Sequence, residues 1–378
     1  MSKRIYSLDV LRGVAIAIML FLDAPPDKIY PILEHAPWAG MTVPDVALPM
    51  FAFAMGAGAA ISMSRRETST KKILRRAAFM FAIGLFLAFL PKVIALLFHD
   101  DYSVFAWQTL KDYVPESFFD AVIIHGRLFG VLQRLAVIYA AGILIARAVR
   151  NEFGILIAAV ALLILSSAGF HLYAPENSFA EAHNISRAVD FIFPGENHIY
   201  TPTHDPEGLY GSIAATASVL FGFLAGKILI DNATSRDKIF LLTAAGVAAL
   251  IAGGLWTNFD IVSKKLWTAP FTLINAGGDF LLLALFTKFE AAAKKFLQPF
   301  GALGTNPLFF FVANQVVLIF MVMLPKEYEG GIYLWLYDHT TEGILSPEFG
   351  ATLFCVLWLL MWLPLGELFY KMKIIIKL

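Results

Sequence analysis

Long apolar runs recur along almost the whole of this chain. A helix needs roughly 20 mainly apolar residues to cross a bilayer, and in lipid its backbone polar groups must be satisfied within the helix. With 58% hydrophobic and 15% charged residues, the sequence predicts an all-α, polytopic membrane helix bundle of about ten transmembrane helices. We expect one domain over residues 1–378. The candidate spans are residues 7–22, 46–63, 73–97, 128–146, 153–170, 212–230, 239–256, 269–286, 306–324 and 349–369.

The orientation of the bundle follows from its basic residues, because Lys and Arg are retained on the cytoplasmic side. Most of the 29 Lys and Arg residues fall in alternate connections, starting with the N-terminal segment. An even number of spans then places both termini in the cytoplasm. Residues 35–45 and a long outer loop at roughly 172–209 fall on the opposite side. Loops of this length are often functional.

Polar residues within the spans are costly, at about 2.5 kcal/mol or more for a charged side chain, so each is a functional candidate. Arg12 lies one helical turn after Asp9, which also allows a local ion pair. Arg134, next to Gln133, is too deep for easy snorkelling. It needs an anion, a carbonyl cluster or water, so it could pair with Asp279 or line a cavity that holds a phosphorylated ligand.

Small residues are spaced for close helix packing in two of the spans. Gly56 opens a run of glycine and alanine, and Gly222 and Gly226 follow the Gly-x-x-x-Gly pattern. Such spacing lets two helix backbones approach closely. We therefore assign these glycines to packing.

Residues 35–45 carry the sequence features most typical of chemistry. Pro37 and Pro44 restrict the backbone on either side of Gly40, which predicts a shaped turn. A neutral histidine near the aqueous side of a membrane cavity acts well as a general base, so His35 is the candidate. A nearby carboxylate would orient it. Three acids are candidates for that role, namely Asp45, Asp23 and Glu34.

Six blocks in the same order resemble the heparan-alpha-glucosaminide N-acetyltransferase family, including its bacterial inner-membrane members. They are residues 7–13 (SLDVLRG), 35–45 (HAPWAGMTVPD), 127–134 (RLFGVLQR), 205–209 (DPEGL), 264–268 (KKLWT) and 304–308 (GTNPL). One block alone would be weak, whereas the ordered set covers nearly the whole chain.

The resemblance implies a transmembrane acetyltransferase of the bacterial inner membrane. Acetyl-CoA would arrive from the cytoplasm, and its acetyl group would pass to the amine of glucosamine or a glucosamine-ended sugar on the periplasmic side. The catalytic residues would be His35, as general base or acetyl carrier, with Asp23 and Asp45. The family has an asparagine near the position of Asp23, and a carboxylate cannot donate a hydrogen bond unless it is protonated.

The two substrates would meet different residues. A basic inner side suits the phosphates of CoA, and an acidic outer side suits a cationic amino sugar. We expect the donor near Arg12, Gln133, Arg134 and Asn306, and the acceptor near Trp38, Arg127, Asp205 and Glu207. The remaining expectations are a lipid bilayer as surroundings, a possible homodimer, no metal site and no nucleic-acid partner.

Two alternatives stay open. In a sugar transporter without chemistry, the intramembrane polar residues would line a path, although the sequence shows no internal duplication. The other alternative is an O-acyltransferase, an enzyme that would transfer the acyl group to an envelope glycan in place of the glucosamine amine. The sequence leaves open the acceptor's size, the acyl length, the order of the chemical steps and the oligomeric state.

Overall fold

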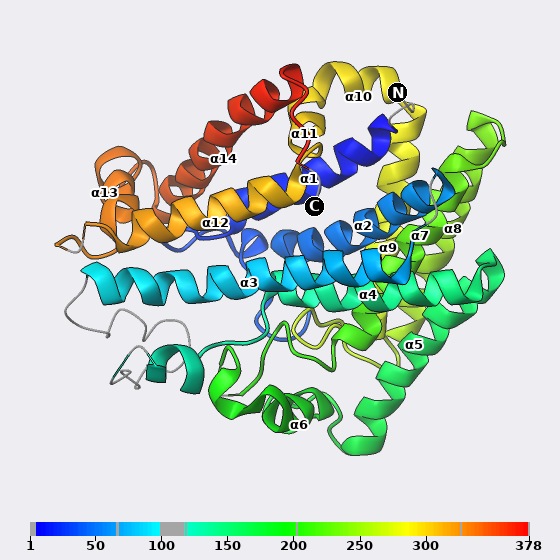
Figure 1. Cartoon of the computed structure of the whole chain (residues 1–378), viewed down its shortest axis with the longest axis horizontal. Helices are drawn as coiled ribbons and strands as arrows, with labels where there is room; N and C mark the ends of the chain where they lie inside the picture. Colours follow the sequence, from blue (N-terminus) through cyan, green and yellow to red (C-terminus); the bar gives the residue numbers. More distant parts are fainter. Residues whose placement is uncertain are drawn as a thin grey trace.

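The computed structural model describes residues 5–65, 68–98, 117, 119–201, 203–325 and 327–376, and within those ranges it contains helices and no β-strand (Figure 1). The long helices are α1 (Tyr6–Leu22), α2 (Ala47–Arg65), α3 (Thr70–Phe98), α4 (Val131–Val149), α5 (Glu152–Tyr173), α7 (Ser212–Ile230), α8 (Ser235–Trp256), α9 (Ala269–Lys288), α12 (Pro307–Met323) and α14 (Pro347–Lys371). The shorter ones are α6 (Ile185–Asp190), α10 (Glu290–Phe296), α11 (Gln298–Leu303), α13 (Gly331–Thr340) and the single turns η1 (Pro31–Leu33), η2 (Val43–Val46), η4 (Asp120–Ile124), η5 (Phe191–Gly195) and η6 (Glu196–His198).

Every predicted span lies on one of the long helices. Within the described ranges, 8 helices are long and apolar enough to cross a membrane. The other two are shorter, since α1 and α12 have 17 residues each, or about 26 Å of helix against the roughly 30 Å of a bilayer's hydrocarbon core. The prediction of a polytopic helical bundle is confirmed, and the chain is a multi-pass membrane protein.

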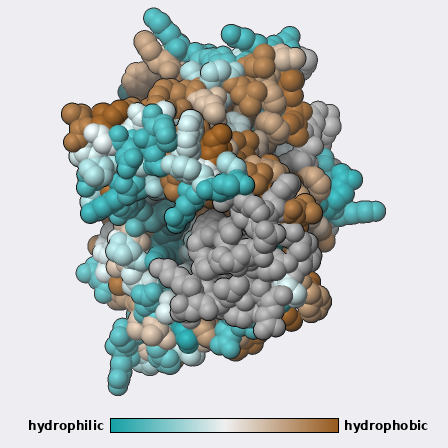
Figure 2. Space-filling model, turned by 90° about the vertical axis from the view of Figure 1, so that its left-hand side faces the viewer, coloured by the Kyte–Doolittle hydropathy of each residue, from teal (hydrophilic) through white to brown (hydrophobic). Residues whose placement is uncertain are grey.

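The ends of the long helices gather at two opposite ends of the bundle (Figure 1). One end holds the starts of α2, α4, α7 and α9 together with α6, and we call it the outer end. The inner end holds the start of α1, which packs on α11, and the end of α14. Figure 2 looks onto the side where α3 and α12 finish, and hydrophilic side chains gather there beside hydrophobic flanks. The first and last described helices therefore meet at one end, as an even number of crossings requires.

The centre of the bundle depends on a close approach of α2 to α7. A Cβ atom on Gly222 would lie 1.9 Å from the carbonyl oxygen of Phe53, and one on Gly56 would lie 2.0 Å from that of Val219. Only glycine leaves room for a neighbouring backbone at such distances. The packing role predicted for these glycines is confirmed.

We expect Gly222→Ala to lower the melting temperature, because its methyl group would overlap the α2 backbone. Overpacking of this kind costs about 1–3 kcal/mol. Gly254→Ala is the matched control, since a Cβ at this position on α8 has no atom within 4 Å. Thermal unfolding in detergent checks both variants, and equal melting temperatures for the two would contradict the close α2–α7 contact.

Candidate active site

Residues 35–45 form a turn that is fixed to the connection between α8 and α9. Thr42 and Asp45 make a reciprocal capping box at the start of η2, so the chain enters α2 in one conformation. Gly40 has φ of +105°, a value that favours glycine, and its N–H donates to the carbonyl oxygen of Val262 at 2.7 Å. The turn predicted from Pro37 and Pro44 is thereby held against a segment more than 200 residues further along the chain.

His35 and Asp45 form the central pair of the site. Their Nδ1 and Oδ1 atoms are 2.6 Å apart, with the His35 side chain 51% exposed and the Asp45 side chain 1% exposed. The second oxygen of Asp45 accepts from the backbone N–H groups of Ala36, at 3.1 Å, and Thr42, at 3.0 Å. A carboxylate held in this way orients the imidazole with Nδ1 as the donor. The other ring nitrogen, Nε2, then carries the lone pair, and Lys264 Nζ lies 3.3 Å from it.

Lys264 completes this group and was given no role by the sequence. Its Nζ lies 3.6 Å from Asp45 Oδ1 and 3.1 and 3.3 Å from the two ring nitrogens of His35. Burial lowers the pKa of Lys264, and the charges of Glu207 and Asp45 oppose that effect. The only available signal was its position in the block at 264–268, because no spacing rule relates residues 229 apart.

Trp38 and Asn275 lie at the edges of the turn. The indole N–H of Trp38 donates to the carbonyl oxygen of Phe179 at 2.8 Å, and its ring meets that of His204 edge-on at 5.0 Å. Asn275 on α9 donates to the Met41 sulfur at 3.3 Å. Trp38 therefore connects the turn with the outer loop, and Asn275 connects it with the bundle.

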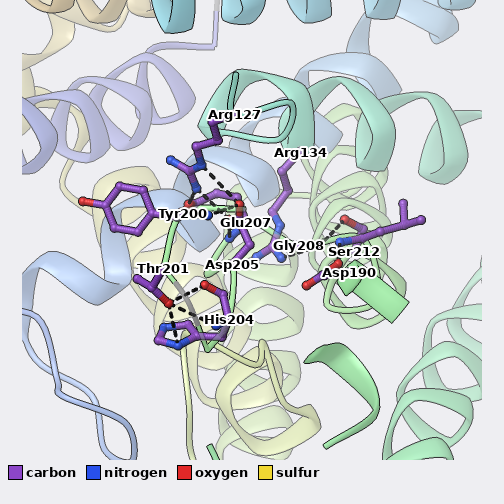
Figure 3. Close-up of polar contacts among 11 residues, drawn as sticks. Arg127, Arg134, Asp190, Tyr200, Thr201, His204, Asp205, Glu207, Gly208 and Ser212 are labelled. Atoms are coloured by element: carbon purple, nitrogen blue, oxygen red, sulfur yellow. Dashed lines mark hydrogen bonds and ion pairs between the residues drawn. The ribbon is translucent and has the colours of Figure 1, made fainter. Parts of the chain in front are cut away.

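A second polar cluster lies beside the start of α4 (Figure 3). Arg127 donates to both oxygens of Asp205, at 2.6 and 3.2 Å, and to Glu207 at 2.5 Å, while its guanidinium stacks 4.4 Å from the Tyr200 ring centroid. Burial alone would lower the pKa of Arg127, but Asp205 and Glu207 raise it, so the arginine stays charged. The structure thus brings together Arg127, Asp205 and Glu207, the residues predicted for the acceptor, as partners of one another.

Arg134 points from α4 toward the same loop (Figure 3). It is 1% exposed, donates to the carbonyl oxygen of Gly208 at 2.7 Å, and lies 5.0 Å from the Trp267 ring centroid. The partner of Arg134 is therefore a backbone carbonyl and an aromatic face, and the suggested pairing with Asp279 is wrong. Gln133 is also buried, and its amide lies against Gly84 of α3.

Asp190 adds a buried carboxyl group to this cluster. Its Oδ1 accepts from the Leu209 N–H at 2.8 Å, whereas the buried Oδ2 has no hydrogen-bond partner within the described residues. Burial raises the pKa of Asp190 from 3.8 to about 7, the Leu209 N–H lowers it, Asp205 raises it, and Arg134 lowers it. The folded protein therefore holds a proton here that the unfolded chain releases near pH 4.

We expect the stability of the folded chain to fall as pH rises from about 4 to about 7. Between these values the folded state binds more protons than the unfolded state at Asp190, so raising the pH favours unfolding. The contribution is at most roughly 4 kcal/mol, at about 1.4 kcal/mol per pKa unit. Asp190→Asn should flatten the melting temperature against pH in this window, and the exposed control Asp231→Asn should not. An unchanged slope in Asp190→Asn would contradict the raised pKa.

The other predicted residues contact groups other than His35. Asp23 accepts hydrogen bonds from Asn314 at 2.8 Å and Gln315 at 2.7 Å, both on α12. Asn306 donates to the carbonyl oxygen of Ile374 and accepts from the N–H of Ile376, so its amide holds the segment after α14.

Arg12 lies on α1, 3.6 Å from Asp9, as the local ion pair predicts, and its guanidinium reaches α2 beside Gly58. The four residues predicted for the donor therefore make their contacts in four separate places. Arg12 contacts α2, Gln133 contacts α3, Arg134 contacts the outer loop, and Asn306 contacts the C-terminal segment.

Comparison with known proteins agrees with the six sequence blocks. A family model described as "Heparan-alpha-glucosaminide N-acetyltransferase, catalytic" matches residues 4–180. The Homo sapiens heparan-alpha-glucosaminide N-acetyltransferase is 24% identical over 442 aligned positions, which cover 100% of this chain and 60% of that protein. The Mus musculus protein of the same name is 23% identical over 386 positions, which cover 84% of this chain and 54% of that protein.

The chain spans somewhat more than half the length of these curated relatives. The match to the catalytic family model includes residues 35–45, where His35, Asp45 and Gly40 are organised as described above. Together these matches show that the chain is similar to the heparan-alpha-glucosaminide N-acetyltransferase family.

Proposed function

We propose that this protein moves an acetyl group from acetyl-CoA to the amine of glucosamine or a glucosamine-ended sugar, with His35 as the base. The observation that carries the proposal is the His35–Asp45 pair, in which a buried carboxylate orients a half-exposed imidazole within the part of the chain that matches an acetyltransferase family model. General bases are built in this way, from a histidine whose second nitrogen is fixed by an acid.

The proposed roles follow the contacts. The acceptor amine attacks the thioester carbon and its proton passes to His35 Nε2. The carbon–sulfur bond then breaks, and the imidazolium returns the proton to the departing sulfur, which releases the CoA thiol. Asp45 stabilises the imidazolium that forms, through the 2.6 Å contact at Nδ1. Lys264, next to the ring nitrogens, stabilises negative charge on the reacting carbonyl oxygen. In the second form of the proposal, His35 itself carries the acetyl group before the amine accepts it.

The surroundings of His35 are proposed to shape the acceptor side. Asp205 and Glu207 form ion pairs with Arg127. We therefore propose that these two acids hold the outer loop in place near Lys264. Trp38, half-buried beside that loop, offers the aromatic face that a sugar ring stacks on. We propose a bacterial inner membrane as the location, with His35 on the periplasmic side and acetyl-CoA on the cytoplasmic side, following the distribution of Lys and Arg.

The purified protein tests the reaction directly. Incubated with acetyl-CoA carrying a labelled acetyl group and with glucosamine, it should yield N-acetylglucosamine, and mass spectrometry distinguishes the amide from an O-acetyl ester. An O-acetyl product would favour the envelope-glycan alternative. Accumulation of unmodified sugar in protein-containing vesicles without any CoA would favour the transporter.

A further inference from the structure

His171, in the last turn of α5, is the centre of a hydrogen-bonded group that the proposed reaction does not use. Its Nε2 atom lies 2.9 Å from Asp260 Oδ1, and its Nδ1 atom lies 3.1 Å from the Ser178 hydroxyl. Ser167, one turn earlier on α5, donates to the same oxygen of Asp260 at 2.9 Å. An ionised carboxylate only accepts hydrogen bonds, so His171 donates to Asp260 through its Nε2–H group.

Asp260 fixes the beginning of the connection between α8 and α9. Its side chain is 1% exposed, and its Oδ2 atom has no hydrogen-bond partner within the described residues. Ser167 and His171 therefore supply the two hydrogen bonds described for this carboxylate. A buried charged group with few donors depends strongly on each of them. The loss of His171 would release the connection at this point.

The same connection carries Lys264 to His35. Val262, two residues after Asp260, accepts a hydrogen bond from the N–H group of Gly40. Two residues further on, the Lys264 ammonium lies 3.1 Å from the nearer ring nitrogen of His35. A lysine side chain is a flexible four-carbon stem, so the place of its charge depends on where the backbone is held.

We propose that His171 is a positioning residue, which fixes the α8–α9 connection through Asp260 and thereby keeps Lys264 against His35. The effect on catalysis rests on the proposed function, whereas the fixing of the connection can be measured without any reaction. His171 makes no contact with substrate in this account, because it acts through Lys264.

Hydrogen–deuterium exchange of the full-length protein in detergent tests the structural step. His171→Ala should speed exchange about tenfold in peptides covering residues 257–268, the loss expected for one hydrogen bond to a charged group. His171→Gln should exchange like the parent protein, because its amide group can still donate to Asp260. His183→Ala is the matched control, since His183 is exposed and its ring contacts Tyr173. Unchanged exchange in His171→Ala, or equally fast exchange in His183→Ala, overturns the inference.

Ser167→Ala isolates the Asp260 contact and serves as the second variant if His171→Ala does not fold. The His171 ring also packs edge-on against Phe179 at 5.4 Å, whereas Ser167→Ala removes only the other hydrogen bond to Asp260 Oδ1. This variant should also speed exchange at residues 257–268. Unchanged exchange there would contradict the fixing of the connection through Asp260.

A double-mutant cycle tests the catalytic step. His171→Ala should lower kcat for acetyl transfer about tenfold, because Lys264 is no longer held in place. In a Lys264→Met background, His171→Ala should lower kcat less than about twofold, since residues that act through one group are not additive. The cycle uses kcat because loss of the Phe179 contact would act on acceptor binding through Trp38, and so on KM.

The outcomes separate this inference from the proposed function. Additive losses in the cycle would overturn the inference, because His171 would then act independently of Lys264. A parent protein that forms no N-acetylglucosamine would contradict the proposed function, and the exchange rates at residues 257–268 would then decide whether His171 fixes the connection.

Discussion

Replacing His35 with alanine is expected to reduce acetyl transfer to glucosamine by about 10²–10⁴-fold, the usual contribution of a positioned general base. If His35 carries the acetyl group, the loss should be complete. The His35 side chain is half-exposed, so its removal leaves no buried cavity and should leave the fold intact. The measurement is the steady-state rate of N-acetylglucosamine formation by protein of unchanged melting temperature.

The histidines elsewhere at the outer end provide controls for this variant. His183 is exposed and is not in contact with Asp45 or Lys264 in the described structure, so His183→Ala should keep the parent rate. Retention of full activity in His35→Ala would remove the imidazole from the mechanism, whatever the other variants show.

Asp45→Asn is expected to lower the rate of acetyl transfer by about 10²–10⁴-fold, nearly as much as His35→Ala, without unfolding the turn. An asparagine carbonyl oxygen can still accept from the N–H groups of Ala36 and Thr42. Its NH₂ group, however, would face His35 Nδ1 and require that nitrogen to be the acceptor, which turns the proton onto Nε2. The imidazole would then present the wrong tautomer, as in the serine protease triad, where the equivalent change costs about 10⁴ in kcat.

Glu34→Gln separates the loss of this oriented charge from a general loss of negative charge near His35. Glu34 is exposed, and its described hydrogen bond uses the backbone carbonyl oxygen, which accepts from Thr42. The rate of acetyl transfer by Glu34→Gln should therefore match that of the parent protein. Equal rate losses in Glu34→Gln and Asp45→Asn would show that surface charge, and not the held tautomer, matters.

The helical bundle could be predicted from the sequence because a segment that crosses lipid must be long, apolar and helical. Long apolar runs, the spacing of Gly222 and Gly226, and the i,i+3 position of Asp9 and Arg12 each correspond to a local feature that the structure contains. The turn at residues 35–45 could also be predicted, since His35 and Asp45 lie close together in the sequence. The sequence left three acids as candidates, and the structure pairs Asp45 with the histidine while Asp23 lies against α12.

The contacts that were missed join distant parts of the chain. Lys264 reaches His35 because the α8–α9 connection forms a backbone bridge with Gly40, and no local pattern encodes that bridge. Asn306 was expected near the donor, but its amide is occupied by the backbone after α14. The sequence identifies a polar residue in or beside a span and does not reveal its partner.

The central proposal is that acetyl enters at the inner end and reaches an amine at the outer end, beside His35. Proteoliposomes that enclose glucosamine, with labelled acetyl-CoA added only outside, test it directly. We predict labelled N-acetylglucosamine inside the vesicles, and no product when both substrates are placed outside together. Product formed only when both substrates share one compartment would contradict transfer across the membrane.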